Sequence, residues 1–450
     1  MSRALSLLLT AAFLFAAHAV RADDGTSLQT LTLQQCIDLA LKQNPSVLKA
    51  QQEIRRTHGL VVEARAGIIP HVTASGDYTQ IDTRAIDRFP FGTNAAPVEF
   101  KNQQQPWSAQ IEASQLLYAG GRVLAGLRAA KFSDQIAILG FQRTVADTIL
   151  NVRTAFYQIL LNKAQVAVRE QSVKLLDQQL EDARHRFDVG AVPRFNVLRA
   201  EVELANAKPP LIRAQNDLRL AREALVKLLA IDSPQTRDFT PITFAGDLTY
   251  EHRPWELGKA LSDALAQRPE LQGAEKQVAV TKETVKVAQA GYKPEVSVFG
   301  DYRIYDSTFG SDLDNTVHGW LVGARATWPL FDGLQTKGRI TQARAQRVQA
   351  ELDYADTRRG IELEVRQAYS DYLQALELLE AQKKTVEQAE ESLRLAEARF
   401  RAGTGTQLDV LSAQTALTEA RSNEIQALYD YNVAIATLER VTGNTVKIAP

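Results

Sequence analysis

The sequence ALKQNP at residues 40–45 returns as ALAQRP at residues 264–269, an interval of 224 positions. Two further motifs keep this interval: AGIIP at 66–70 returns as AGYKP at 290–294, and GDY at 76–78 is repeated at 300–302. An ordered set of matches at one interval is the signature of an internal duplication. The chain is therefore predicted to contain two copies of one structural unit.

The interval between the copies shortens to 213 positions in the later part of each copy. The motifs that show this are LYAG at 117–120 with LFDG at 330–333, VRTAF at 152–156 with VRQAY at 365–369, and FDVG at 187–190 with FRAG at 400–403. The first copy thus has about 11 additional residues between Tyr78 and Leu117. A length difference confined to one short stretch indicates a surface loop.

The N-terminal 22 residues have the pattern of a secretory signal peptide. A basic start at Met1-Ser2-Arg3 precedes an apolar run over residues 4–17 and small residues before Ala22, where we expect cleavage. The single cysteine, Cys36, lies beyond that point and excludes an intramolecular disulfide. We expect Cys36 to be a buried thiol, and we expect no lipid anchor. The near balance of 52 Lys and Arg against 53 Asp and Glu argues against a nucleic-acid partner.

Two stretches, residues 121–189 and 334–402, contain no proline and are rich in good helix formers. Each predicts one helix of roughly 100 Å at 1.5 Å per residue. Apolar positions step by four and three from Ile361 to Phe400, with Gln382 as the polar interruption, which is typical of coiled-coil packing. A long solvated two-helix hairpin would show the same spacing.

Shorter helices are expected on both sides of each long one. They cover about 33–66 and 194–229 in the first copy, and about 255–290 and 407–441 in the second. The copies themselves span 23–230 and 257–442. Prolines in the linker 231–256 exclude a continuous helix there. We expect this linker and the tail 443–450 to wrap the helical layer as a belt.

Two β-hairpins, at residues 71–117 and 295–330, are predicted from strict alternation of apolar and polar residues. Strands of this length with terminal aromatic residues suit an outer-membrane barrel, although a small soluble sheet would look similar. The aromatic residues expected at the membrane interfaces are Tyr78, Trp107, Tyr302, Trp320 and Trp328. Four strands cannot close a barrel, so the chain must oligomerise if they cross a membrane.

The order of these motifs resembles the TolC family of outer-membrane efflux proteins. The residues that carry the resemblance are FRAGTGTQLDVLSA at 400–413, AGIIPHV at 66–72 and LYAGGR at 117–122. The resemblance implies a mainly α fold in a homotrimer, with a 12-helix α-barrel continued into a 12-stranded β-barrel. It also implies a passive exit duct in the outer membrane, with a long periplasmic extension, for a tripartite efflux pump or a type I secretion system. A periplasmic adaptor, an inner-membrane transporter and outer-membrane lipid are the implied partners.

The resemblance further implies a gate where the helix turns around Gly190 and Gly403 converge. By position, Asp409 matches a ring carboxylate of the family and Phe400 matches its aromatic residue. The sequence departs from the family pattern at three gate positions, which are Gly405 in place of an arginine, Ser412 in place of a second carboxylate and Asn196 in place of a partner acid. Phe400 cannot form a hydroxyl hydrogen bond and Gly405 cannot form a salt bridge, so we hypothesise a constriction with one acidic ring of Asp409 that is closed mainly by packing. Three close carboxylates would raise one another's pKa and favour cations. The alternative is that Asp409 only caps its helix.

No catalytic, metal-binding or cofactor-binding pattern is found in the sequence. The histidines after the signal peptide are scattered without ligand spacing, and no glycine-rich phosphate loop is present. We therefore expect no enzyme activity, no metal and no cofactor. The alternative function is an exported soluble coiled-coil adaptor that bridges a transporter to another channel. A third possibility, an exported hydrolase, lacks a nucleophile motif.

Overall fold

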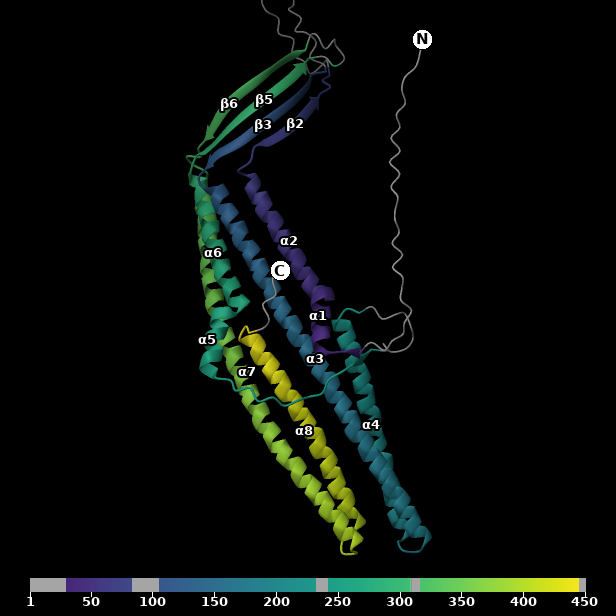
Figure 1. Ribbon diagram of the computed structural model, residues 1–450. Helices are drawn as coiled ribbons and strands as arrows, with labels where there is room; N and C mark the ends of the chain where they lie inside the picture. The colour runs from purple at the N-terminus through teal and green to yellow at the C-terminus, as the bar shows by residue number, and fades with distance from the viewer. Residues whose placement is uncertain (1–29, 83–104, 232–241, 308, 310–315, 445–450) are drawn as a thin grey trace, which may run out of the picture.

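The computed structural model describes residues 30–82, 105–231, 242–307, 309 and 316–444, and shows a long helical rod with a small sheet at one end (Figure 1). The predictions for the signal peptide, most of both hairpin tips, part of the linker and the last six residues lie outside this part of the chain. Among the described helices, none combines the length and apolar character needed to cross a membrane.

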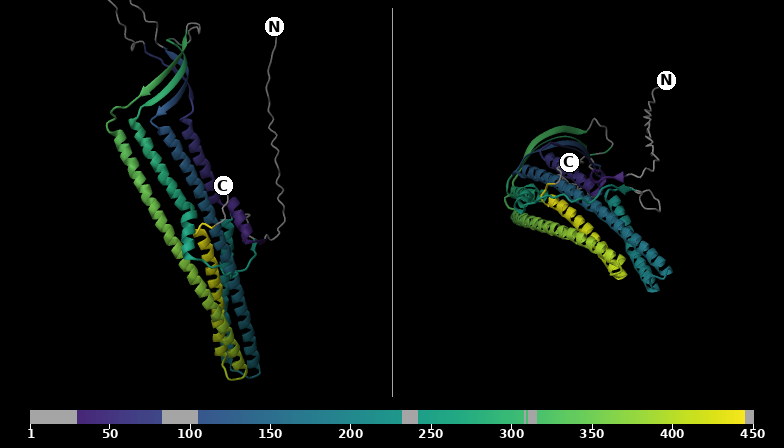
Figure 2. Two further views of the ribbon diagram at one scale, coloured as in Figure 1. Left: turned by 60° about the vertical axis from the view of Figure 1, so that its left-hand side comes forward. Right: turned by 60° about the horizontal axis from the view of Figure 1, so that its bottom comes forward.

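Two helices of 67 residues, α3 (Arg122–Asp188) and α7 (Gln335–Arg401), run from the sheet to the far end of the rod. There the chain reverses into α4 (Arg194–Leu228) and α8 (Gln407–Val441), of 35 residues each. These return helices cover the half of each long helix that is distant from the sheet, and shorter helices cover the other half (Figure 2). The helices at the start of a copy and its return helix thus lie end to end along one long helix.

The single helix predicted at the start of each copy is instead a pair of helices. The first copy has α1 (Leu33–Gln43) and α2 (Pro45–Ala66), and the second has α5 (Leu257–Gln267) and α6 (Pro269–Gln289), followed by the short 3-10 helix η2 (Ala290–Tyr292). The reason is the proline at the first position of the later helix, which pushes the preceding residue out of the helical region. Asn44 and Arg268 accordingly have ψ angles of 125° and 124°.

The sheet contains four antiparallel strands in the order β2-β3-β5-β6. These are β2 (His71–Tyr78), β3 (Trp107–Ala119), β5 (Glu295–Asp306) and β6 (Val317–Thr327). The two hairpins join through β3 and β5, so β2 and β6 form the edges, and neither edge pairs with another described strand. Strand β6 ends one residue before Trp328, which was predicted inside it, because Pro329 follows and cannot donate to a ladder. The indole Nε1 of Trp328 instead donates to the Tyr292 carbonyl at 3.1 Å.

The register gives the sheet one apolar and one polar face, as the alternation predicted. Ala74, Ile111, Tyr302 and Trp320 are aligned across the four strands, and the neighbouring row on the other face contains Thr73, Glu112, Asp301 and Leu321. On β3 the polar-face side chains from Ser108 to Leu116 are half-buried, whereas Ala109, Ile111 and Ala113 are exposed. The side chains of this inner strand are therefore more crowded on the polar face.

The described part of the linker, residues 242–256, crosses the middle of the rod (Figure 1). Its first residues form β4 (Thr243–Phe244), which pairs in parallel with β1 (Thr30–Leu31). Farther along, the hydroxyl of Tyr431 on α8 donates to the Glu251 carbonyl at 2.8 Å, and that of Tyr372 on α7 donates to the Arg253 carbonyl at 2.9 Å. These bonds satisfy backbone groups that have no regular partner and fix the linker to both helices.

The largest apolar cores lie at the same level as this linker. Phe156, Leu225 and the buried thiol Cys36 belong to the core of the first copy, and Tyr431 and Leu379 to that of the second. A network of ion pairs lies beside the second core: Arg440 pairs with Asp147, Glu270 and Glu364, and Arg268 pairs with Glu270 and Glu364. Burial acts to raise the pKa of Glu270, but hydrogen bonding and charge from Arg268 outweigh it, so the pKa is lowered.

Candidate functional site

The candidate site lies at the end of the rod distant from the sheet, where two helical hairpins meet. Each hairpin has an apolar core of its own: Leu180, Ala183, Ala200 and Leu204 between α3 and α4, and Val386, Leu417 and Ala420 between α7 and α8. Gly190 and Gly403, both predicted at the turns, end α3 and α7 with φ angles of 77° and 75°. This left-handed conformation favours glycine and allows a tight reversal of the chain.

The contact between the two hairpins is polar, in contrast to the core inside each one. Ser172, Gln179 and Arg186 follow one another at seven-residue spacing along α3. The Gln179 amide Nε2 donates to Gln414 Oε1 at 2.7 Å, and Ser172 Oγ accepts from the hydroxyl of Thr418 at 3.4 Å. Because polar contacts of this kind add little net stability, the two hairpins are less firmly joined to each other than each is within itself.

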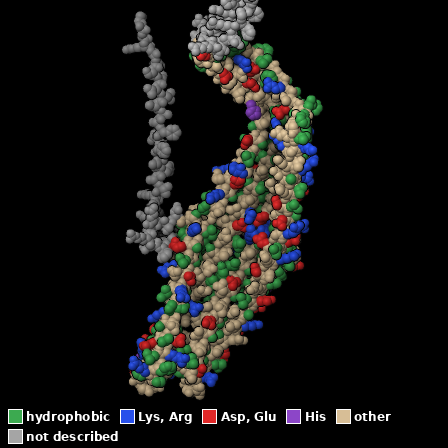
Figure 3. All heavy atoms as spheres, turned by 180° about the vertical axis from the view of Figure 1, so that it is seen from behind, with side chains coloured by type: hydrophobic (Ala, Val, Ile, Leu, Met, Phe, Trp, Pro, Cys, Tyr) green, Lys and Arg blue, Asp and Glu red, His purple; other side chains and the backbone are tan. Residues whose placement is uncertain are grey.

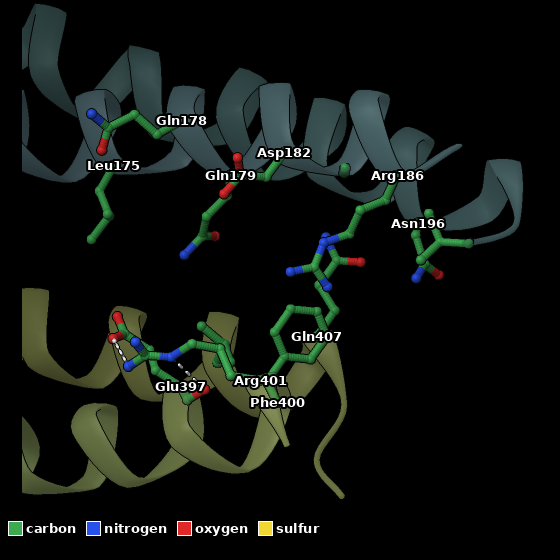
Figure 4. Close-up of a pocket in the computed structure, with 13 residues that line it drawn as sticks. Leu175, Gln178, Gln179, Asp182, Arg186, Asn196, Glu397, Phe400, Arg401 and Gln407 are labelled. Carbon is green, nitrogen blue, oxygen red and sulfur yellow. Dashed lines mark hydrogen bonds and ion pairs between the residues drawn. The ribbon is translucent and has the colours of Figure 1, made fainter. Parts of the chain in front are cut away.

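Arg186 is the last member of this series and lies on Phe400 of α7 (Figure 4). The guanidinium carbon is 5.0 Å from the ring centroid, within the range of a cation–π contact. The side chains of Arg186, Phe400, Asn196 and Gln407 line a cavity of about 290 Å³ between the hairpin tips. The structure thus brings together two predicted residues, Phe400 and Asn196, and adds an arginine from the first copy.

We call the polar contact between the two hairpins the seam; it contains Ser172, Gln179, Arg186, Gln414 and Thr418. Some side-chain atoms of glutamines in and beside the seam have no hydrogen-bond partner. Among the described residues, Gln179 Oε1, Gln414 Nε2 and Gln407 Oε1 are buried and make no hydrogen bond. A buried polar atom without a partner costs about 1–3 kcal/mol. The contact between the two hairpins is therefore less stable than the same contact area could make it.

Asp409 does not enter this cavity and instead takes part in a capping box at the start of α8. Its backbone N–H donates to Thr406 Oγ1 at 3.2 Å, and its carboxylate accepts from the Thr406 backbone N–H at 2.9 Å and from the Thr406 hydroxyl at 2.8 Å. These bonds from Thr406 lower the pKa of Asp409. Within one chain Asp409 therefore serves the helix cap, and Ser412 lies exposed one turn further on.

The absence of a side chain at Gly405 is explained by how closely its backbone approaches the end of α7. A Cβ added to Gly405 would lie 3.1 Å from both Arg399 Cβ and the Phe400 backbone nitrogen. The Gly405 N–H also donates to the Arg399 carbonyl at 3.0 Å. The turn is therefore folded tightly onto the end of α7, which disfavours a larger residue at the position where the family pattern has an arginine.

Arg186 and Gln179 were not predicted as site residues, because the heptad pattern identifies packing positions by their apolar side chains and these two residues are polar. Their seven-residue spacing is a detectable signal, but only the fold shows that a second hairpin faces it. Among the residues that the structure describes, no group of three or more His, Cys, Asp or Glu side chains is arranged to hold a metal ion.

A comparison with protein families identifies the chain. The family profile described as "Outer membrane efflux protein" matches residues 36–230 and 260–444, which is most of the chain and includes both copies. The chain belongs to the outer membrane efflux protein family. As a member of this family it is an outer-membrane channel protein of the efflux and secretion type, with the TolC-like fold that the sequence resembled.

Individual relatives are similar over nearly their full length. The chain is 25% identical to outer membrane protein TolC of Vibrio cholerae, over 98% of this chain and 96% of the relative. It is also 25% identical to the cobalt-zinc-cadmium resistance protein CzcC of Cupriavidus metallidurans, over 98% and 99%. These similarities favour the channel over the soluble adaptor that the sequence left open.

Solved structures show the same fold at lower identity. The outer membrane protein VceC of Vibrio cholerae has a TM-score of 0.73 at 19% identity, covering 91% of this chain and 96% of that one. The open state of the MtrE outer membrane channel of Neisseria gonorrhoeae has a TM-score of 0.75 at 19% identity, covering 91% and 88%. The arrangement of helical rod and sheet described above is therefore that of an outer-membrane efflux channel.

Proposed function

We propose that three copies of this efflux-family protein form one passive exit duct through the outer membrane and the periplasm. The observation that supports this most directly is the sheet, which has two edges that pair with no other described strand and two chemically different faces. Strand β2 runs away from the helices and β6 runs toward them, so β6 of one copy can pair with β2 of the next in the antiparallel sense. Three such contacts would remove every free edge.

In this assembly the apolar face would contact lipid and the polar face would line the bore. Tyr78 and Trp107 are paired at the tip end of the apolar face, where both rings contact Phe309 at centroid distances of 5.2 and 6.3 Å. Trp328 lies at the opposite end of the sheet, with Tyr302 and Trp320 between the two levels. Aromatic side chains at both ends of membrane strands are expected at the headgroup level.

The duct would obtain its energy and its choice of substrate from partners. Proteins of this family act with a periplasmic adaptor and an inner-membrane transporter, and we propose the same arrangement here. Lys and Arg side chains are intermixed with Asp and Glu over the face seen in Figure 3, which offers no extended basic surface to a nucleic acid. We assign no catalytic role to the chain.

The hairpin tips would form the gate. In the closed state Arg186 holds the α3/α4 hairpin to Phe400 of α7, and opening would separate the hairpins along their polar seam. Asp409 from three copies would add an acidic ring at this end. The capping bonds lower the pKa of each Asp409, opposing the increase that three neighbouring carboxylates would cause.

The three-copy arrangement can be tested by cysteine crosslinking between the edge strands. Thr73→Cys or Ser75→Cys on β2 is combined with Leu321→Cys on β6 and oxidised in outer-membrane vesicles. We expect covalent dimers and trimers, whereas each single variant gives only dimers or monomers. Background from Cys36 should be low because it is fully buried. Monomers alone from both combinations would argue against the closed ring.

The gate can be tested by conductance in planar bilayers. Phe400→Leu keeps an apolar side chain but removes the cation–π contact, worth about 0.5–1 kcal/mol at an exposed site. We expect a higher open probability than in wild type. Phe195→Leu is the matched control, because its contact with Arg199, at 6.0 Å, lies within α4 and joins no second hairpin. Equal behaviour of the two variants would exclude Phe400 as a latch.

The acidic ring needs a separate measurement. Asp409→Ala should reduce the preference for cations over anions, since it removes three carboxylates from one level of the duct. An unchanged preference would leave Asp409 with the capping role alone.

A further inference from the structure

An aromatic side chain interrupts the polar face of the sheet at a position that the proposed function does not use. Phe299 lies on β5, where its register partners are Ser114 of β3 and Gly323 of β6. The other residues of this face on β5 include Ser297, Asp301 and Arg303, which are polar. A large apolar ring among them calls for a specific contact, which β6 provides.

Gly323 gives the Phe299 ring a place against the backbone of β6. A Cβ added to Gly323 would lie 2.8 Å from Phe299 Cζ and 3.2 Å from Cε1. Real side chains do not approach so closely, so the ring occupies the space that any larger residue at 323 would need. Glycine within a strand often marks such a close approach. The ring therefore lies against β6 and does not extend freely from the sheet.

Arg325, two residues along β6 toward the helices, covers the Phe299 ring. Its guanidinium carbon is 5.1 Å from the ring centroid. Among the described residues no carboxylate forms an ion pair with Arg325, and its side chain is exposed. The aromatic face orients the cation without neutralising it.

The charged residues on the two sides of the Phe299–Arg325 pair, toward the strand tips and toward the helices, have different partners. Glu112 and Asp301 face each other across β3 and β5, two residues further toward the strand tips than Phe299. In the opposite direction, Glu295 pairs with Arg122 at 3.0 Å and is thereby neutralised. Arg325 is thus the uncompensated charge on the polar face nearest to the helices, among the strand residues described.

We infer that Arg325, held on Phe299, is a selectivity-determining residue that favours anionic solutes where the strands meet the helices. The inference rests on the proposed three-copy duct, in which the polar face lines the bore. Three copies place three fixed guanidinium groups at one level. Their influence extends about 8 Å at physiological ionic strength and farther in dilute salt. Solutes that carry carboxylate or phosphate groups are the class that this level attracts.

The charge is tested by reversal potentials of the full-length protein in planar bilayers across a KCl gradient. Arg325→Gln should raise the permeability ratio of cation to anion roughly twofold, and Arg325→Lys should leave it near the wild-type value. Channels of normal conductance with an unchanged ratio in Arg325→Gln would overturn the inference. Absence of channels from the wild-type protein would instead contradict the proposed function.

The contact of the Phe299 ring with Gly323 is tested by a double-mutant cycle. Gly323→Ala should displace the Phe299 ring toward the bore and lower the single-channel conductance. Phe299→Ala alone should not lower it, and Phe299→Ala combined with Gly323→Ala should restore the wild-type value. Unchanged conductance in Gly323→Ala, or a decrease that persists in the double variant, would contradict the placement of Phe299 on β6.

Discussion

At the residue scale, Asp409 shows how one carboxylate can have two opposing demands on its protonation. The capping box stabilises the ionised form, because Thr406 donates two hydrogen bonds to the carboxylate. A ring of three such groups would instead favour partial protonation. In the single chain the capping effect is visible, since the pKa of Asp409 is lowered from its ordinary 3.8.

Thr406→Ala should therefore loosen the start of α8. We expect amide hydrogen exchange in residues 407–410 to become roughly fivefold faster, as for the loss of an N-cap. In the wild type, the ionised Asp409 carboxylate stabilises the folded helix start fully above about pH 3.8, which is its pKa in the unfolded chain. This stabilisation is lost as the pH falls through the lowered pKa of Asp409 in the folded chain. Thr415→Ala is the control, because its hydroxyl bonds only to the Leu411 carbonyl inside α8. Equal amide exchange rates in the two variants would show that Thr406 and Asp409 do not stabilise the start of α8.

At the element scale, each hairpin has an apolar core, whereas the contact between the two hairpins is polar. Replacing both Gln179 and Gln414 by leucine removes one hydrogen bond together with two unpartnered buried atoms. Because each such atom costs about 1–3 kcal/mol, the double variant should bind the hairpins more tightly. We expect a higher thermal midpoint in detergent and a lower open probability in bilayers.

The single variant Gln414→Leu supplies the contrast for this prediction. It leaves both polar ends of Gln179 unsatisfied and should lower the thermal midpoint. A double variant that is no more stable than the single one would show that the seam is not limited by its polar groups.

Helix α4 contains a second element-scale feature, the consecutive prolines Pro209 and Pro210 in its interior. The helix continues through them although neither can donate a backbone hydrogen bond. Pro209→Ala with Pro210→Ala should stabilise α4 by up to about 3 kcal/mol per proline and slow its amide exchange. Ser422→Ala with Asn423→Ala, at the equivalent positions of α8, should change little. Unchanged exchange in α4 would mean that packing on α3 already offsets the cost.

Sequence periodicity was sufficient to predict the helices and strands but not the contacts between them. The long helices followed from a lack of proline, and the strands from alternation around Asp77 and Asp301. Pro45 and Pro269 were recognised only as repeat markers, although a proline at these positions begins a new helix. The Arg186–Phe400 contact could not be predicted, because it joins residues 214 positions apart whose neighbourhood depends on how two hairpins lie together.

At the scale of the whole molecule, the two copies differ in the polar residue near the end of the return helix. Arg440 of the second copy is 12% exposed and joins helices α3, α6, α7 and α8 through ion pairs. The equivalent residue of the first copy, Lys227, is exposed. Arg440 thus joins helices of both copies, whereas Lys227 lies at the surface.

Arg440→Met should lower the free energy of unfolding by about 3 kcal/mol, because three carboxylates lose a shared partner. Lys227→Met should change it by less than about 0.5 kcal/mol. Urea unfolding in detergent at pH 7 measures both. Glu270 adds a pH dependence: its stabilising contribution is complete above about pH 4.5 and is lost as the pH falls through its lowered folded value. Equal losses in the two variants would mean that Arg440 has no special role.

The duplication also determines what a docking protein meets at the far end of the duct. Each chain ends there in two hairpins of similar length, one with Gly190 and one with Gly403 at its turn. A threefold assembly would present six such ends around a circle, alternating between two kinds. A partner that binds in six copies would then have three in one environment and three in another, so its affinity should divide into two classes even though its own subunits are identical.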